Sequence, residues 1–213
     1  MIVVHHLNNS RSQRVLWLLE ELDIEYEIKY YERDEKTMLA PDSLRQVHPL
    51  GKSPVITDGD LTLAESGAII EYLVERYGNG RLVPPPNTSE RLRYTYWLHY
   101  AEGSAMPPLL LNLILNRFGL GDSQAMSAFV APQIKLHYDY IEGELRKSIW
   151  FVGSYLTAAD IQMSFPLELL AMLPQEILSR PSIGEFLERI HTRKAYLRAL
   201  ERGGKYDFAN SIP

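Results

Sequence analysis

The stretch His48–Ile70, HPLGKSPVITDGDLTLAESGAII, contains the features that decide the fold of the first part of the chain. Pro54 stands directly before an apolar pair, and a proline fits the first residue of a strand because it has no backbone N–H to donate. The turn Asp58-Gly59-Asp60 joins this pair to a second apolar alternation, as in a β-hairpin. After Ser66 the apolar residues fall at helical spacing. The stretch predicts strands over 55–57 and 61–63 and a helix over 66–77.

Two short motifs in this stretch suit an amino-acid-like ligand. The bond before Pro54 is the kind for which the cis form costs only about 0.5–1 kcal/mol. A cis bond would turn the backbone N–H and C=O of Val55 toward an extended ligand. At the start of the predicted helix, backbone N–H groups near Ser66 attract a carboxylate, while Glu65 is an acceptor for an ammonium group. Each dipeptide alone is more often a simple turn or cap, but their order and spacing of roughly ten residues predict a binding site.

The residues before this stretch predict a strand–helix–strand unit. Ile2–Leu7 is a short apolar run typical of a buried strand, and a polar connection follows it. Apolar residues at helical spacing then predict a helix that ends near Asp23, and the alternation over 25–31 predicts a second strand. With a helix starting near Pro41, the predicted order is βαβαββα, with a right-handed crossover in the first unit.

The second part of the chain is predicted to be all-helical. The segment 78–89, GNGRLVPPPNTS, contains two glycines and three consecutive prolines, which cannot continue a helix. We expect an interruption at Met106-Pro107-Pro108 and a capping box over Thr157–Asp160 that starts a buried helix. The predicted domains are residues 1–79 and 88–213, joined by a linker over 80–87, and the predicted helices of the second domain span about 88–118, 124–146, 157–172 and 182–200.

The two motifs, in this order, resemble the glutathione-binding segment of the cytosolic glutathione S-transferases. The resemblance extends over the whole chain, and the segments HHLNNSRSQR (5–14) and WLHYAEGSAMPPLL (97–110) are similar to a bacterial and fungal branch of the family. It implies a thioredoxin-like domain followed by an all-helical domain, and a homodimer formed through the helices after the linker. It also implies that glutathione is the co-substrate, whose thiol is activated for conjugation to a small hydrophobic electrophile or for reduction of a peroxide.

The resemblance to the serine-type members assigns the catalytic role to Ser10. In those transferases a hydroxyl at this position donates a hydrogen bond to the sulfur of glutathione. A free thiol, with a pKa of about 8.5, is mostly protonated at pH 7, and a donated hydrogen bond favours the thiolate. Ser10 follows the first predicted strand, at the end of the sheet where open α/β folds bind ligands. Asn9 and Ser12 are alternatives for the same role, and a plain N-cap is the simpler interpretation of Ser10.

The resemblance assigns the remaining groups of glutathione to five residues. Lys52 is expected to meet the glycyl carboxylate, and Arg11 to assist there or at the sulfur. The backbone of Val55 is expected to pair with the peptide, and Glu65 and Ser66 are expected to bind its ammonium and carboxylate ends. The electrophile is expected between the domains, facing the sulfur. Candidate walls for it are Tyr94, Tyr96, Trp97, His99, Tyr100 and Met106, although aromatic residues at helical spacing are more often core.

Composition excludes several other kinds of chemistry. The 213 residues contain no cysteine, so a disulfide, a thiolate zinc site and a cysteine nucleophile are all excluded. The net charge of −5, without a basic run, argues against a nucleic-acid partner.

No apolar run reaches the roughly 18–20 residues of a membrane span, and the start of the chain is unlike a signal peptide. We therefore predict a cytoplasmic protein with no membrane partner. No metal is predicted, because His5 and His6 are neighbours on a strand and point to opposite faces.

Two other functions remain open. One is a non-catalytic carrier of glutathione or a hydrophobic ligand, and the other is a transferase-like protein-interaction domain whose site has decayed. The presence of Lys52, Pro54, Glu65 and Ser66 together argues against decay. The sequence therefore predicts a glutathione S-transferase, with glutathione-dependent peroxide reduction as a side activity.

Overall fold

The computed structural model describes residues 1–121 and 123–210. Residues 122 and 211–213, which the predicted helical domain includes, lie outside the described residues. The chain divides into two compact units. The first combines Met1–Pro84 with Ile190–Asn210, and the second contains Pro85–Arg189.

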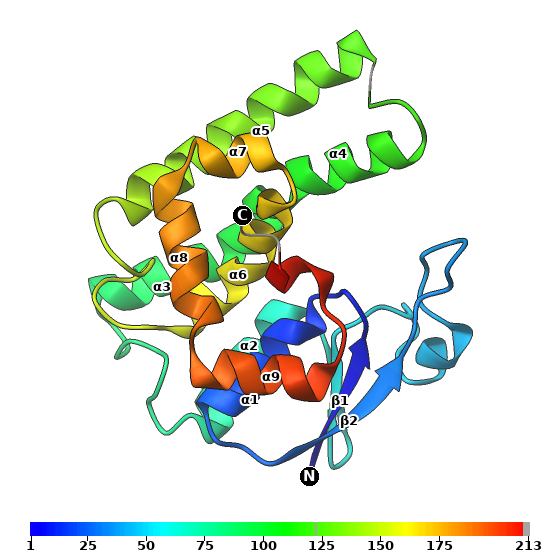
Figure 1. Cartoon of the computed structure of the whole chain (residues 1–213). Helices are drawn as coiled ribbons and strands as arrows, with labels where there is room; N and C mark the ends of the chain where they lie inside the picture. Colours follow the sequence, from blue (N-terminus) through cyan, green and yellow to red (C-terminus); the bar gives the residue numbers. More distant parts are fainter. Residues whose placement is uncertain (122, 211–213) are drawn as a thin grey trace. The chain divides into compact units, whose positions relative to one another are not determined.

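The first unit is built on a four-stranded mixed sheet with the strand order β2-β1-β3-β4. Strand β1 pairs in parallel with β2 and antiparallel with β3, and β4 is antiparallel to β3. A helix connects β1 to β2, a short 3₁₀-helix precedes the hairpin, and a second helix follows it, so the predicted βαβαββα order is confirmed (Figure 1). The elements are β1 (Ile2–Leu7), α1 (Ser12–Glu21), β2 (Tyr26–Tyr31), the 3₁₀-helix Asp42–Gln46, β3 (Val55–Asp58), β4 (Leu61–Ala64) and α2 (Ser66–Tyr77).

Helix α1 is almost completely covered, because helix α9 (Lys194–Gly203) packs along it within the same unit (Figure 1). Glu20 of α1 is buried and accepts hydrogen bonds from Arg198 and Arg202 of α9 at 2.6 and 2.9 Å. A third arginine, Arg193, binds the carboxylate of Glu21 at 2.6 and 2.9 Å. These ion pairs attach the C-terminal end of α1 to α9.

The prediction of one helix over 182–200 is wrong. The structure has α8 (Pro181–His191) and α9 with a break between them. The backbone of Arg193 is extended at the break, with φ −71° and ψ 132°, and its side chain is held by Glu21. Helical spacing continues across the break in the sequence, so the spacing alone does not reveal it.

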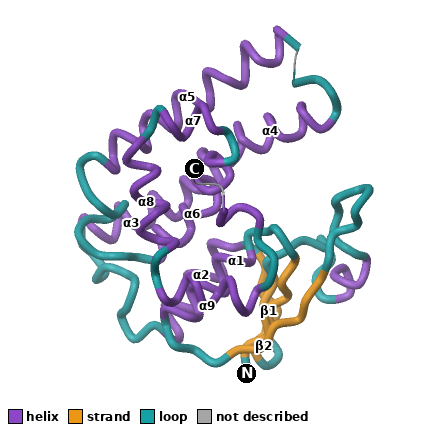
Figure 2. Tube along the Cα trace, in the orientation of Figure 1, coloured by secondary structure: helices purple, strands orange, loops and turns teal. Residues whose placement is uncertain are grey.

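In the described part of the second unit the regular elements are helices joined by loops (Figure 2). An isolated bridge joins Trp150 and Gly153. The interruption expected near Met106 takes the form of a π-helical turn, Ala101–Ala105, directly before it. All 14 residues of α6 are buried, so this helix is the centre of the unit, as predicted. Its helices are α3 (Ser89–Tyr100), α4 (Met106–Arg117), α5 (Gln124–Leu145), α6 (Ala158–Ala171), α7 (Pro174–Leu178) and α8.

The capping box predicted before α6 is present. Thr157 precedes the first residue of the helix, and both of its expected contacts with Asp160 are made. Among the described residues, the helices are all too short or too polar to cross a membrane.

Candidate functional site

Ser10 lies in the loop between β1 and α1 and is buried, with 3% of its surface exposed. Its hydroxyl oxygen is 2.7 Å from the hydroxyl of Ser12 and 3.4 Å from that of Ser53, and it accepts the backbone N–H of Ser12 at 3.2 Å. Ser53 is the residue before Pro54. The fold therefore brings the loop after β1 into contact with the proline loop, although about forty residues separate them in the sequence.

The proline loop has the geometry that the sequence predicts. The Ser53–Pro54 bond is cis, and the Ser53 hydroxyl donates to the backbone carbonyl of His5 at 3.0 Å. Val55 is buried at the first position of β3, where it pairs with His5 of β1 and with Ala64 of β4. These contacts join the loop firmly to the middle strands of the sheet.

Glu65 and Ser66 lie at the start of α2. Glu65 is exposed and has φ +70°, a conformation that costs a residue with a side chain about 1–3 kcal/mol and that often marks a binding site. Ser66 is buried, and its hydroxyl accepts a hydrogen bond from the guanidinium of Arg14 at 3.4 Å. An exposed carboxylate thus stands beside the N-terminal end of a helix, which attracts negative charge.

Two arginines that the sequence analysis did not single out support these loops. Arg14 is buried in α1, on a face that is otherwise mostly apolar, and reaches Ser66 of α2. Arg33 donates to the backbone carbonyls of Asn8 and Asn9 at 3.2 and 3.3 Å. Burial lowers the pKa of Arg33, and the nearby charge of Arg11 lowers it further. A charged residue inside an apolar helical pattern is the signal that identifies Arg14, whereas nothing in the sequence pattern identifies Arg33.

The predicted cations and the alternative residues occupy different environments. Lys52 is exposed and Arg11 is half-buried. The Asn9 side chain binds Asp207 in both directions, donating to its carboxylate at 2.7 Å and accepting its backbone N–H at 2.9 Å. Ser12 is fully buried, with its hydroxyl 2.8 Å from Nδ1 of His6. Asn9 and Ser12 are therefore engaged away from the proline loop, and Ser10 is the one of the three that contacts it.

The two adjacent histidines on β1 have separate partners. Nδ1 of His5 lies 2.9 Å from the Tyr31 hydroxyl, and Nδ1 of His6 faces Ser12. Within residues 1–121 and 123–210, no group of three or more His, Cys, Asp or Glu side chains is placed to hold a metal ion.

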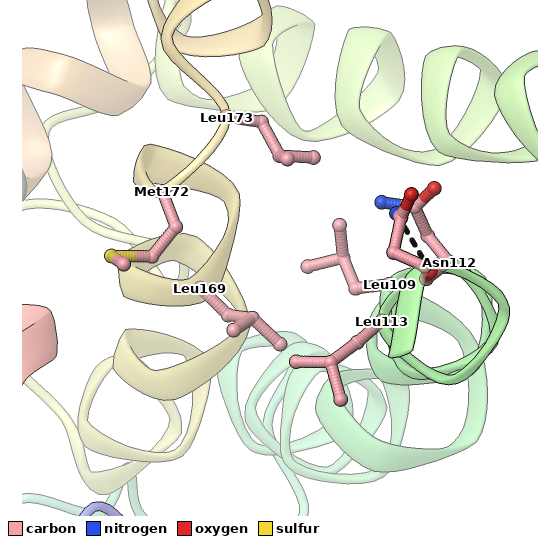
Figure 3. A pocket seen from close by; sticks show the side chains of 7 residues that line it. Leu109, Asn112, Leu113, Leu169, Met172 and Leu173 are labelled. Carbon is pink, nitrogen blue, oxygen red and sulfur yellow. Dashed lines mark hydrogen bonds between the residues drawn. The ribbon is translucent and has the colours of Figure 1, made fainter. Parts of the chain in front are cut away.

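The helical unit contains an apolar pocket with a volume of about 220 Å³ (Figure 3). Leu109 and Leu113 of α4 point toward Leu169 of α6 and Leu173 (Figure 3). Asn112 and Asn116 also line the pocket, and the Asn116 amide donates to the Asn112 carbonyl at 2.9 Å. The residues that line it are Leu109, Asn112, Leu113, Asn116, Leu169, Met172 and Leu173.

Three of the candidate walls belong to the core of the helical unit. Tyr94, Trp97 and Met106 are buried in the helical unit, and Trp97 stacks on Tyr140 with ring centroids 5.6 Å apart. Their helical spacing reflects packing, which is the more common meaning of such a pattern.

The comparisons with known proteins agree with this geometry. Residues 1–75 match the family model for the glutathione S-transferase N-terminal domain, and residues 106–194 match that for the C-terminal domain. "Glutathione S-transferase 3" of Schizosaccharomyces pombe is 38% identical over 182 residues, which cover 78% of this chain and 73% of the relative.

Two solved structures are also similar. A crystal structure of a glutathione S-transferase from Actinobacillus pleuropneumoniae is 39% identical and has a TM-score of 0.89, covering 99% of this chain and 96% of that one. A glutathione transferase from Phanerochaete chrysosporium, solved in complex with oxidized glutathione, is 24% identical with a TM-score of 0.80, over 95% of this chain and 96% of the other. The chain therefore belongs to the glutathione S-transferase family.

Proposed function

We propose that the chain joins glutathione, through its thiol sulfur, to a small apolar electrophile, with Ser10 as the catalytic residue at the sulfur. Membership of the family gives the class of reaction and the co-substrate. The observation that carries the assignment of Ser10 is its contact with Ser53 at 3.4 Å, beside the Pro54 loop. A thiol bound along this loop lies within reach of the Ser10 hydroxyl.

The chemistry needs little from the protein beyond the thiolate. The thiol loses its proton to solvent, the Ser10 hydroxyl donates a hydrogen bond to the anion, and the sulfur then forms a bond to carbon as the leaving group departs with its electron pair. A charge-assisted hydrogen bond contributes about 1.5–3 kcal/mol. Each 1.4 kcal/mol lowers the thiol pKa by about one unit.

The other groups of glutathione have matching partners in the first unit. Lys52 and Arg11 supply positive charge for the glycyl carboxylate, and the backbone of the Pro54 loop, directly before Val55 of β3, pairs with the peptide. Glu65 accepts from the ammonium group, and the hydroxyl of Ser66 and the start of α2 bind the remaining carboxylate. The positive φ of Glu65, a strained backbone conformation that often marks a binding site, supports this assignment. So does Ser66, which is buried and held by Arg14 before a ligand arrives.

Turnover of an aryl halide with glutathione tests the proposal. We expect the purified protein to bind immobilised glutathione, to release halide, and to form the thioether at a rate well above the uncatalysed one. The Glu65→Gln variant is expected to bind glutathione about tenfold more weakly, since the loss of one charge-assisted bond costs about 1.5–3 kcal/mol. Binding without turnover would favour the carrier, and failure to bind would favour a decayed interaction domain.

We assign the electrophile to the apolar pocket of the helical unit. Leu113 lines this pocket and Leu110 does not, yet both lie on α4 and are similarly exposed, at 46% and 43%. Leu113→Gln is expected to raise KM for an apolar electrophile about tenfold. The reason is that the electrophile no longer buries apolar surface against the leucine side chain. KM for glutathione is expected to stay unchanged. Leu110→Gln is the matched control, and equal effects of the two variants would contradict the assignment.

Three features of the sequence-based prediction remain proposals. A homodimer through the first helices of the second unit is supported by exposed apolar side chains there, Leu92 on α3 and Phe129 and Leu136 on α5, which are 73%, 63% and 63% exposed. Reduction of a peroxide would use the same thiolate. A cytoplasmic location stays a prediction from the sequence.

A further inference from the structure

Three buried side chains connect the core of the first unit to the site. Nδ1 of His6 lies 2.8 Å from the Ser12 hydroxyl, and this hydroxyl lies 2.7 Å from that of Ser10. All three residues are at most 3% exposed. Each hydroxyl has a single proton to donate. The protonation of His6 therefore decides which atom donates in the Ser12–His6 contact, and this in turn decides which atom donates in the Ser10–Ser12 contact.

The protonation of His6 follows from its surroundings. Burial lowers the pKa of His6 to about 4, although a hydrogen bond with the backbone of Gly203 raises it. The ring is therefore neutral at pH 7 and holds one N–H. A backbone group that raises the pKa of an imidazole is an acceptor, so the partner is the carbonyl of Gly203. Nε2 is the nitrogen on that side, 3.5 Å from the place of a Cβ on Gly203.

The shortest contacts of Ser12 and Ser10 then favour one direction for the remaining bonds. Because the N–H of His6 is on Nε2, Nδ1 is an acceptor and takes the hydroxyl proton of Ser12. Ser12 has one proton, and Nδ1 of His6 at 2.8 Å is a nearer acceptor for it than the Leu7 carbonyl at 3.4 Å. The 2.7 Å contact with Ser10 therefore carries the proton of Ser10. Ser53 cannot supply another, since its hydroxyl donates to the carbonyl of His5. The single proton of Ser10 thus goes to Ser12 at 2.7 Å in preference to the longer, 3.4 Å contact in which Ser10 can donate to Ser53, and lone pairs of Ser10 face the proline loop.

We propose that His6 is a positioning residue that, through Ser12, turns the hydroxyl proton of Ser10 away from the bound thiol. The inference rests on the proposed role of Ser10 at the sulfur. When the thiolate forms, the proton of Ser10 turns to the sulfur, and either the Ser10–Ser12 or the Ser12–His6 bond is lost. A buried polar group without its partner costs free energy. His6 therefore raises the pKa of bound glutathione above the value that Ser10 alone would give it.

Removing the acceptor tests this inference. In His6→Phe, the proton of Ser12 is free to turn to Ser10, and the proton of Ser10 is free to turn to the sulfur. The pKa of bound glutathione, read from the ultraviolet absorbance of its thiolate, is expected to fall by about one unit. This shift corresponds to the free energy of one hydrogen bond that the thiolate form no longer loses. Ser12→Ala removes the same constraint with a much smaller change in packing. It is expected to give the same shift, and the double variant no more than either single one.

The controls separate this inference from the proposed function. His5→Phe changes the adjacent histidine, whose ring faces Tyr31, and is expected to leave the thiol pKa unchanged. If Ser10→Ala fails to raise that pKa, the proposed role of Ser10 is wrong. A second outcome would overturn only the role of His6. In that outcome Ser10→Ala raises the pKa of bound glutathione, but Ser12→Ala fails to lower this pKa. In the unmodified protein, nitrogen NMR at neutral pH is expected to find His6 protonated at Nε2, and protonation at Nδ1 would also overturn it.

Discussion

The Ser10→Ala variant is expected to bind glutathione with unchanged affinity and to lose at least tenfold in turnover. The substitution removes the hydroxyl proposed to donate to the thiolate, and a charge-assisted hydrogen bond is worth about 1.5–3 kcal/mol. That range corresponds to a rate loss of roughly ten- to a hundredfold. The groups proposed to hold the rest of the tripeptide stay in place, because they lie on other loops. Steady-state kinetics with an aryl halide, together with calorimetric titration of glutathione, measures both quantities.

Asn9→Ala is the matched comparison for Ser10→Ala, because Asn9 is the preceding residue in the same loop. Its side chain is bound to Asp207, so its loss is expected to loosen the C-terminal segment without removing a group at the sulfur. Normal turnover in Ser10→Ala and a large loss in Asn9→Ala would transfer the catalytic role to Asn9. An equal loss of glutathione affinity and turnover in Ser10→Ala would instead indicate that the hydroxyl serves binding.

Local patterns in the sequence predict a helix or strand well when its apolar residues recur at a regular spacing and when turn or capping residues mark its ends. The hairpin has a proline before it and a glycine in its turn, and helix α6 has Thr157 and Asp160 at its start. The break between α8 and α9 has no proline or glycine, and is made by the pairing of Arg193 with Glu21, about 170 residues earlier. Contacts this distant leave no periodicity to detect.

The candidate site was predictable to a similar extent. The motif residues Lys52, Glu65 and Ser66 follow from short patterns, since each pattern carries its own chemistry. The roles of Arg14 and His6 depend on which residues the fold brings beside them. A histidine on an apolar strand is more often a satisfied core residue than a functional one, and only its contact with Ser12 connects it to the site.

Asp160→Ala is expected to destabilise the helical unit by about 3 kcal/mol or more at neutral pH. The Asp160 carboxylate is fully buried and accepts three hydrogen bonds, from the backbone N–H of Phe151 at 2.8 Å and from the N–H and hydroxyl of Thr157 at 2.7 and 2.8 Å. The substitution leaves all three donors without this acceptor, and each such loss costs about 1–3 kcal/mol. Chemical denaturation followed by circular dichroism measures the change, with Glu185→Ala on the exposed face of α8 as the control.

The deficit of Asp160→Ala is also expected to depend on pH. Burial raises the pKa of Asp160 from 3.8 to about 6, against the opposing effect of its hydrogen bonds. Between these two pH values the Asp160 carboxyl is ionised in the unfolded chain but still protonated in the folded protein. This carboxyl therefore makes the wild-type protein lose stability as pH rises from about 4 to about 6, and the variant lacks this loss. The deficit should therefore shrink by up to about 3 kcal/mol over this interval and stay constant above it. A deficit that grows with rising pH would mean that the three donors outweigh burial and hold the carboxylate ionised.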